Sequence, residues 1–245
     1  SSFKSIKEFV ETFKMKFETL DILVNNAGQV NNYYSLTEDN IEKTLQVNTF
    51  APMILTQELI GMLNDSEGRV IHVSSKAHLR FHFEADYIKK EWTKEGWSFN
   101  KEKYNLFYQY HISKLGNVYF NQYLNEFIKK NELKVKTAAL HPGVIHTGIA
   151  RDVKLYIKII LMMAYPIFWL FTKSLSRGAQ TTLHLCYADD KEFVSGEYYK
   201  DCGVTPVAPH AELSQKENRI TYIEWARKMI NQYGQQSGTE FSLSI

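Results

Sequence analysis

Tyr110 and Lys114 are the pair of side chains whose types and spacing most directly permit proton chemistry in this sequence. They lie four residues apart in a segment with helical periodicity, so both are expected on one face of a helix. A lysine ammonium about 4 Å from a phenolate stabilises it by roughly 4 kcal/mol at an effective dielectric near 20. Such a contact lowers the tyrosine pKa from about 10 towards neutrality, which lets the phenol exchange a proton with a carbonyl or alcohol oxygen.

The Tyr-x-x-x-Lys spacing occurs a second time, at Tyr187 and Lys191. On spacing alone, either pair is more simply interpreted as a tyrosine and a lysine on the surface of a helix. The first pair differs in its surroundings, because it lies between a strand-like run that ends at Ser75 and another that is followed by Pro142-Gly143. We therefore take Tyr110 and Lys114 as the candidate site and the second pair as its natural control.

The segments around the candidate pair alternate between helical and strand-like patterns. Helical periodicity covers residues 3–17, 38–63, 108–129, 176–188 and 221–233. Short apolar runs that are typical of buried strands cover residues 21–28, 68–75, 133–140 and 193–200. Pro52 is expected to kink or split the second helix just after Asn48. This alternation predicts an α/β fold with a parallel sheet covered by helices.

Length and composition restrict the class of protein. The 245 residues correspond to one domain, which we expect over residues 1–233, with the Gly-, Ser- and Gln-rich residues 234–245 as a flexible tail. The formal net charge of +2 argues against a nucleic-acid-binding protein. Cys186 and Cys202 form neither a CxxC pair nor a zinc pattern, so we predict no metal site and no disulfide scaffold.

Taken in order along the chain, the motifs resemble those of the short-chain dehydrogenase/reductase family. The matching elements are Asn25-Asn-Ala-Gly28 after a strand, Asn48 in a helix, Ser75 at a strand end, Tyr110 with Lys114, and Pro142-Gly143 after the next strand. Each alone has an ordinary structural explanation, such as a turn glycine or a capping serine. Within the family, residues 73–78, 141–147, 177–182 and 195–202 are most similar to the retinol-dehydrogenase-like branch.

The resemblance implies roles for individual residues. Tyr110 is the general acid or base, Lys114 lowers its pKa and holds the nicotinamide ribose, Ser75 hydrogen-bonds the substrate oxygen, and Asn48 holds a water of a proton relay. Further contacts with the cofactor are implied for Asn25, Ala27, Gly28, Pro142, Gly143, Val144 and Thr147.

The resemblance also implies a cofactor and a reaction. The cofactor is NAD(P), with NADP preferred on the resemblance only. The reaction is hydride transfer between nicotinamide and a carbonyl or alcohol, expected to be a lipophilic molecule such as a retinoid, a steroid or a lipid aldehyde.

The glycine-rich phosphate loop of the family is not found in this chain. It should follow a first strand well before Asn25, whereas only about twenty residues precede the first strand-like run. We therefore expect a Rossmann-like doubly wound sheet that is truncated at its N-terminal side, with the 21–25 strand at an edge. An alternative function follows, a catalytically inactive family member that acts as a non-enzymatic or partner-binding protein. Another Rossmann-like class, such as a methyltransferase, gives no reason for the ordered motifs.

Residues 155–171 are the most apolar stretch of the sequence. Lys158 and Pro166 interrupt it, and a membrane-spanning helix needs about 20 apolar residues. By its position the stretch resembles the substrate-covering segment of the family, which implies an apolar lid over a lipophilic substrate. A helix that packs on the sheet is the alternative. An apolar lid could also touch a membrane surface. The sequence thus indicates the cytoplasm or the cytosolic face of an intracellular membrane, and it leaves a homo-oligomer open.

Overall fold

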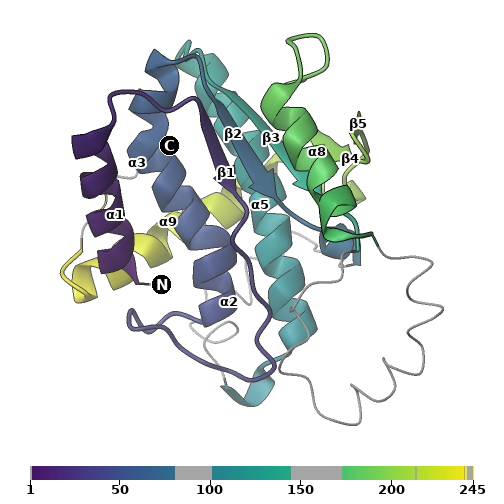
Figure 1. The fold of residues 1–245 in the computed structure, drawn as a ribbon. Helices are drawn as coiled ribbons and strands as arrows, with labels where there is room; N and C mark the ends of the chain where they lie inside the picture. The colour runs from purple at the N-terminus through teal and green to yellow at the C-terminus, as the bar shows by residue number, and fades with distance from the viewer. Residues whose placement is uncertain (1, 81–100, 145–172, 213, 240, 242–244) are drawn as a thin grey trace.

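A mostly parallel sheet with helices on both faces forms the body of the protein (Figure 1). The computed structural model describes residues 2–80, 101–144, 173–212, 214–239, 241 and 245. The strands of this part lie in the order β1 (Ile22–Asn25), β2 (Arg69–Val73), β3 (Lys136–His141), β4 (Tyr198–Lys200) and β5 (Gly203–Val204). The first four are parallel, and β5 pairs with β4 in the antiparallel sense. The predicted parallel α/β sheet is confirmed, and β1 lies at an edge of the described sheet.

Alternate residues of β1 to β4 point into two separate apolar cores. Val70 of β2 and Tyr198 of β4 belong to the larger core, which lies under α3 (Ala51–Asp65), α5 (Leu106–Lys130) and α9 (Lys216–Gln236). Ile71 of β2 and Tyr199 of β4 belong to the smaller core, which is covered by α8 (Leu175–Tyr187). Helices on both faces are the feature that defines a doubly wound sheet, so this prediction is also confirmed (Figure 1).

Several helices begin where a polar side chain binds the first free N–H groups. Ser2 and Ser5 form a reciprocal capping box at the start of α1 (Phe3–Lys16), and the Asn105 side chain accepts hydrogen bonds from the first turn of α5. The Glu42 carboxylate caps α2 (Lys43–Leu45) in the same way, which is why that helix begins at residue 43 and not at residue 38 as predicted.

The interruption predicted at Pro52 takes the form of a π-helical turn, and the helix does not split. Between α2 and α3 the chain forms a π-helical turn, Gln46–Phe50, and Pro52 lies in the first turn of α3. Proline has no N–H, so it cannot donate to the carbonyl of Asn48, four residues earlier. Single π-helical turns are frequent at functional sites, and this one carries Asn48.

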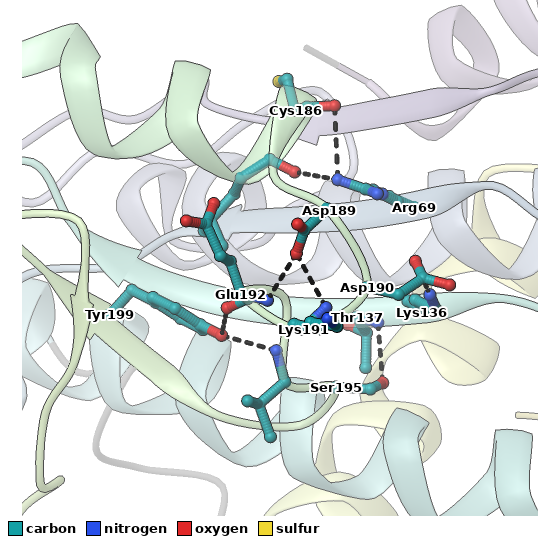
Figure 2. Close-up of polar contacts among 12 residues, drawn as sticks. Arg69, Lys136, Thr137, Cys186, Asp189, Asp190, Lys191, Glu192, Ser195 and Tyr199 are labelled. Carbon is teal, nitrogen blue, oxygen red and sulfur yellow. Dashed lines mark hydrogen bonds and ion pairs between the residues drawn. The ribbon is translucent and has the colours of Figure 1, made fainter.

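The strand predicted over residues 193–200 is shorter in the structure, where β4 begins only at Tyr198. Figure 2 shows the reason, because the Asp189 carboxylate accepts hydrogen bonds from the N–H groups of Lys191 and Glu192 and closes a turn there. After the turn, the Ser195 hydroxyl accepts a hydrogen bond from the N–H of Thr137 in β3, in place of a strand carbonyl (Figure 2). The chain therefore reaches β3 through the Ser195 side chain and through the backbone of Gly196 and Glu197 before β4 begins.

The terminal helix α9 extends from Lys216 to Gln236, beyond both ends of the predicted 221–233 segment. Past its end, the ring of Phe241 contacts that of Phe3 edge-to-face at 5.6 Å, and the N–H of Ile245 donates to the Gln57 side chain. The flexibility expected for residues 234–245 stays a prediction. No helix within the described residues is long and apolar enough to cross a membrane, and residues 155–171 lie outside them.

Gly116 allows close approach of α5, α9 and the π-helical turn. A Cβ added there would lie 2.1 Å from the Tyr222 hydroxyl and 2.9 Å from Cγ2 of Thr49, and both of these side chains are fully buried. We expect Gly116→Ala to lower the free energy of unfolding by about 2–3 kcal/mol, because overpacking a closed core forces neighbours to move.

Gly61 provides the matched control for this substitution. It lies in α3 with nothing within 4 Å of an added Cβ, so Gly61→Ala should raise the free energy of unfolding by up to about 1 kcal/mol through helix propensity alone. Urea denaturation of both variants measures the two effects. A Gly116→Ala protein as stable as the wild type would contradict the packing described above.

Candidate active site

Three side chains from two elements converge beyond the carboxyl end of β2. Ser75 follows the strand, and Tyr110 and Lys114 lie on one face of α5. The Ser75 hydroxyl lies close enough to the Tyr110 phenol to act on the phenol's pKa as a hydrogen-bonding neighbour. Lys114 Nζ lies 5.8 Å from the centroid of the Tyr110 ring and donates to the backbone carbonyl of Val73 at 2.8 Å. The structure thus brings Ser75, Tyr110 and Lys114 together, as the sequence predicted.

Burial controls the proton affinity of both titratable groups. It lowers the pKa of Lys114 to about 8, because the ammonium has lost its water and only 4% of the residue remains exposed. It also raises the pKa of the Tyr110 phenol, and the neighbouring Ser75 hydroxyl opposes this rise. The sequence predicted that Lys114 would lower the pKa of Tyr110. The structure differs, because burial raises the pKa of Tyr110, and Nζ donates to the Val73 carbonyl and faces the Tyr110 ring.

Asn48 is fully buried and holds the loop that follows β1. Its side-chain Oδ1 accepts from the N–H of Gln29 at 2.8 Å, and its Nδ2 donates to the Gln29 carbonyl at 2.9 Å. The same Nδ2 donates to Ser113 Oγ at 3.0 Å, and Ser113 in turn donates to the carbonyl of Tyr110. These bonds use both N–H groups of the Asn48 amide, so a relay water would bind the second lone pair of Oδ1 or the backbone carbonyl.

Gly28 lies against the same group of side chains. A Cβ placed on it would lie 3.2 Å from Lys114 Nζ and 3.5 Å from Asn48 Oδ1. A side chain at this position would therefore fill the space beside the ammonium. Glycine keeps that space open to a ligand, and Asn26, Ala27 and Gly28 are all exposed.

Of the remaining residues predicted to contact a cofactor, some lie at the same end of the sheet as Ser75 and one points its side chain into the core. Asn25 points into the core, where its Nδ2 donates to Thr56 and contacts His72, so only its backbone is available to a ligand. Pro142, Gly143 and Val144 follow β3 at the same end of the sheet as Ser75, and Gly143 has a φ of 96° that favours glycine. Thr147 lies outside the described residues.

Comparison with known proteins assigns the chain to a family. Residues 1–85 match the profile described as short chain dehydrogenase. Retinol dehydrogenase 12 of Bos taurus is 35% identical over 226 residues, which cover 90% of this chain and 65% of that protein. Retinol dehydrogenase 13 of Homo sapiens is 33% identical over 229 residues, covering 93% and 66%. This chain belongs to the short-chain dehydrogenase/reductase family.

The family assignment agrees with the fold of solved structures. The crystal structure of an NADPH-bound carbonyl reductase from chicken fatty liver superposes with a TM-score of 0.56 at 18% identity, over 84% of this chain and 73% of that one. A short-chain dehydrogenase/reductase of Caenorhabditis elegans superposes with a TM-score of 0.58 at 17% identity, over 88% and 74%. These similarities show the fold. The chain spans a little under two thirds of the length of its curated relatives. It covers 65% of retinol dehydrogenase 12 of Bos taurus and 60% of retinol dehydrogenase 14 of Mus musculus.

Three further residues lie at the site in the structure, although the sequence did not assign them to it. His78 is buried beside Ser75, His141 contacts the backbone at Lys76, and the Tyr198 ring packs on His78. His78 and His141 fall inside the segments that resemble the retinol-dehydrogenase-like branch, so their positions were visible, but nothing in the spacing indicated a contact. Tyr198 was hidden in a strand pattern, where an aromatic residue is more often part of the core.

Proposed function

We propose that this chain carries the catalytic site of a nicotinamide-dependent oxidoreductase that interconverts a lipophilic, retinoid-like carbonyl and its alcohol. The observation that carries the proposal is the Tyr110 phenol beside the Ser75 hydroxyl, with the buried Lys114 ammonium against its ring. Family membership adds support, because the curated relatives named above are retinol dehydrogenases.

The two hydroxyl groups can bind one substrate oxygen together. The Ser75 hydroxyl orients the carbonyl oxygen, and the Tyr110 phenol donates its proton to that oxygen as negative charge develops there. The Lys114 ammonium lies 5.8 Å from the centroid of the Tyr110 ring and would attract the phenolate that remains there. At neutral pH a lysine with a pKa of about 8 is mostly charged, as this role requires.

The residues present fit a nicotinamide cofactor. When bound, the nicotinamide supplies or accepts the hydride. Lys114 Nζ would hold its ribose, which the open space at Gly28 would accommodate. The backbone of Pro142, Gly143 and Val144 would lie beside its ring. We propose NADP as the preferred form on the family resemblance, with NAD as the alternative to be tested.

Exposed apolar side chains support a lipophilic substrate. Leu79 lies four residues after Ser75, Val144 follows Gly143, and Leu175 lies at the start of α8, and each has at least 44% of its surface exposed. The N–H of Lys173 donates to the Val144 carbonyl at 2.7 Å, which joins the last two of these segments. Contact of residues 155–171 with a membrane surface, placement in the cytoplasm or on the cytosolic face of a membrane, and a homo-oligomer stay proposals.

The proposal is tested by incubating the purified protein with retinaldehyde, and in parallel with a short water-soluble aldehyde, in the presence of NADPH or NADH. We expect consumption of the reduced cofactor with retinaldehyde, faster with NADPH, and little with the short aldehyde. Absence of turnover with either cofactor and every carbonyl, in a folded protein, would favour the inactive, partner-binding alternative.

A further inference from the structure

The peptide group that joins Ser75 to Lys76 lies between two buried histidines. Its carbonyl oxygen, on Ser75, is 2.6 Å from His78 Nδ1 and also accepts from the His78 backbone N–H. Its N–H, on Lys76, donates to His141 Nδ1 at 3.3 Å. Both polar atoms of one peptide plane are therefore bound by imidazoles, one from the turn η2 (Lys76–Arg80) and one from the end of β3.

The partners of the two rings determine where each proton lies. A carbonyl can only accept, so His78 Nδ1 must carry a proton, which leaves His78 Nε2 free to accept from the N–H of Ala208 at 3.4 Å. A backbone N–H can only donate, so His141 Nδ1 must be unprotonated and its proton lies on Nε2. The two imidazoles are therefore neutral and of opposite tautomers.

Burial keeps both rings in these neutral forms. His78 is 1% exposed and His141 is 4% exposed. Burial lowers the pKa of His78, and burial followed by the charges of Lys76 and Lys173 lowers the pKa of His141 to about 4. The ring of Tyr198 adds a steric constraint, because it packs edge-on against His78 with centroids 4.7 Å apart.

We propose that His78 and His141 are positioning residues that fix the Ser75–Lys76 peptide and thereby aim the Ser75 hydroxyl at Tyr110 and at the substrate oxygen. The inference rests on the proposed function for its catalytic consequence. Ser75 lies beyond the end of β2, where no strand pairing restrains it. Its hydroxyl accepts a hydrogen bond from the N–H of Ala77 and also interacts with the Tyr110 phenol. A rotation of this peptide would displace the Ala77 N–H that holds the Ser75 hydroxyl. A misplacement of a reacting group by about 1 Å can cost roughly 100-fold in rate.

The first test reads the tautomers directly and does not depend on activity. In protein labelled with ¹⁵N-histidine, the side-chain nitrogen shifts at neutral pH are expected to show a neutral His78 protonated on Nδ1 and a neutral His141 protonated on Nε2. A charged ring, or the opposite tautomer at either position, would overturn the proposal. Because this readout needs no substrate, a failure of the proposed function leaves it interpretable.

The second test uses paired substitutions at each histidine. His78→Phe and His141→Phe keep a ring but remove the hydrogen bond, and we expect each to lower kcat by about 10- to 100-fold with a smaller change in KM. His78→Asn restores a donor near the position of Nδ1, and His141→Asn restores an acceptor there, so both should recover most of the lost kcat. His184→Phe, on α8 over the opposite face of the sheet, is the control and should leave kcat unchanged.

Folded Phe variants with wild-type kcat, or Asn variants that are folded but no more active than the Phe variants, would overturn the positioning role. If a Phe variant does not fold, the nitrogen shifts of the wild-type protein still test the proposal, because the wrong tautomer or a charged ring at either histidine would overturn it.

Discussion

Tyr110→Phe is expected to lower kcat/KM for carbonyl reduction by about 10²–10⁴-fold, because it removes the proton donor while the ring stays in place. Removal of the phenol hydroxyl takes away its interaction with Ser75 and no more of the side chain, so the fold should stay intact. The cost should be at most about 1 kcal/mol of stability. Steady-state kinetics with retinaldehyde and the better of the two cofactors measures the change, with circular dichroism to confirm folding.

Tyr187→Phe is the matched control for this substitution. Tyr187 also precedes a lysine by four residues, but it ends α8 with 82% of its surface exposed and should be nearly silent. Retention of more than a few per cent of the activity by Tyr110→Phe, with every substrate tested, would show that Tyr110 is not the proton donor.

Lys114→Met should make the protein more stable and less active at the same time. Burial holds the pKa of Lys114 at about 8, against an ordinary value of 10.5, so the charged form costs on the order of 3 kcal/mol in the folded state. Loss of the hydrogen bond to the Val73 carbonyl offsets about 1 kcal/mol of this. We expect the melting temperature to rise by about 2–8 °C, while activity falls and the cofactor binds more weakly.

The pH dependence of this gain has a definite sign. Below pH 8, Lys114 is charged in both the folded and the unfolded state, so the full cost is present in the wild type. Between pH 8 and pH 10.5, the unfolded chain binds a proton that the folded state has released, so wild-type stability rises with pH and approaches that of the variant. Lys134→Met, at an exposed ion pair with Glu67, is the control. An unchanged gap in melting temperature across this range would contradict the burial of a charged Lys114.

The central features of this structure could be predicted because they are local in the sequence. Apolar periodicity specified α5 to within two residues, and the i, i+4 spacing placed Tyr110 and Lys114 on one face of it. Pro52 specified the interruption in the second helix because a missing N–H is a property of one residue. The order of strands and motifs was enough to bring Ser75 to Tyr110, since parallel strands end at one edge of the sheet.

The features that could not be predicted depend on contacts between distant segments. The short β4 follows from the side chain of Asp189, which closes a turn in a run that otherwise has strand composition. The pKa of Tyr110 was predicted from the proximity of a charge, but burial is a property of the whole fold and raises it. The inward orientation of Asn25 depends on Thr56, 31 positions away, and His78 accepts a hydrogen bond from Ala208, 130 positions away.

The central claim is that this site transfers hydride to a carbonyl with Tyr110 as the proton donor. Its most direct test is the transfer of deuterium from a reduced cofactor labelled at the nicotinamide C4 to retinaldehyde, followed by mass spectrometry of the retinol formed. We expect one deuterium on the former carbonyl carbon with the wild-type protein, and loss of nearly all labelled product with Tyr110→Phe. No labelled retinol from the folded wild type, or equal amounts from the wild type and the variant, would contradict it.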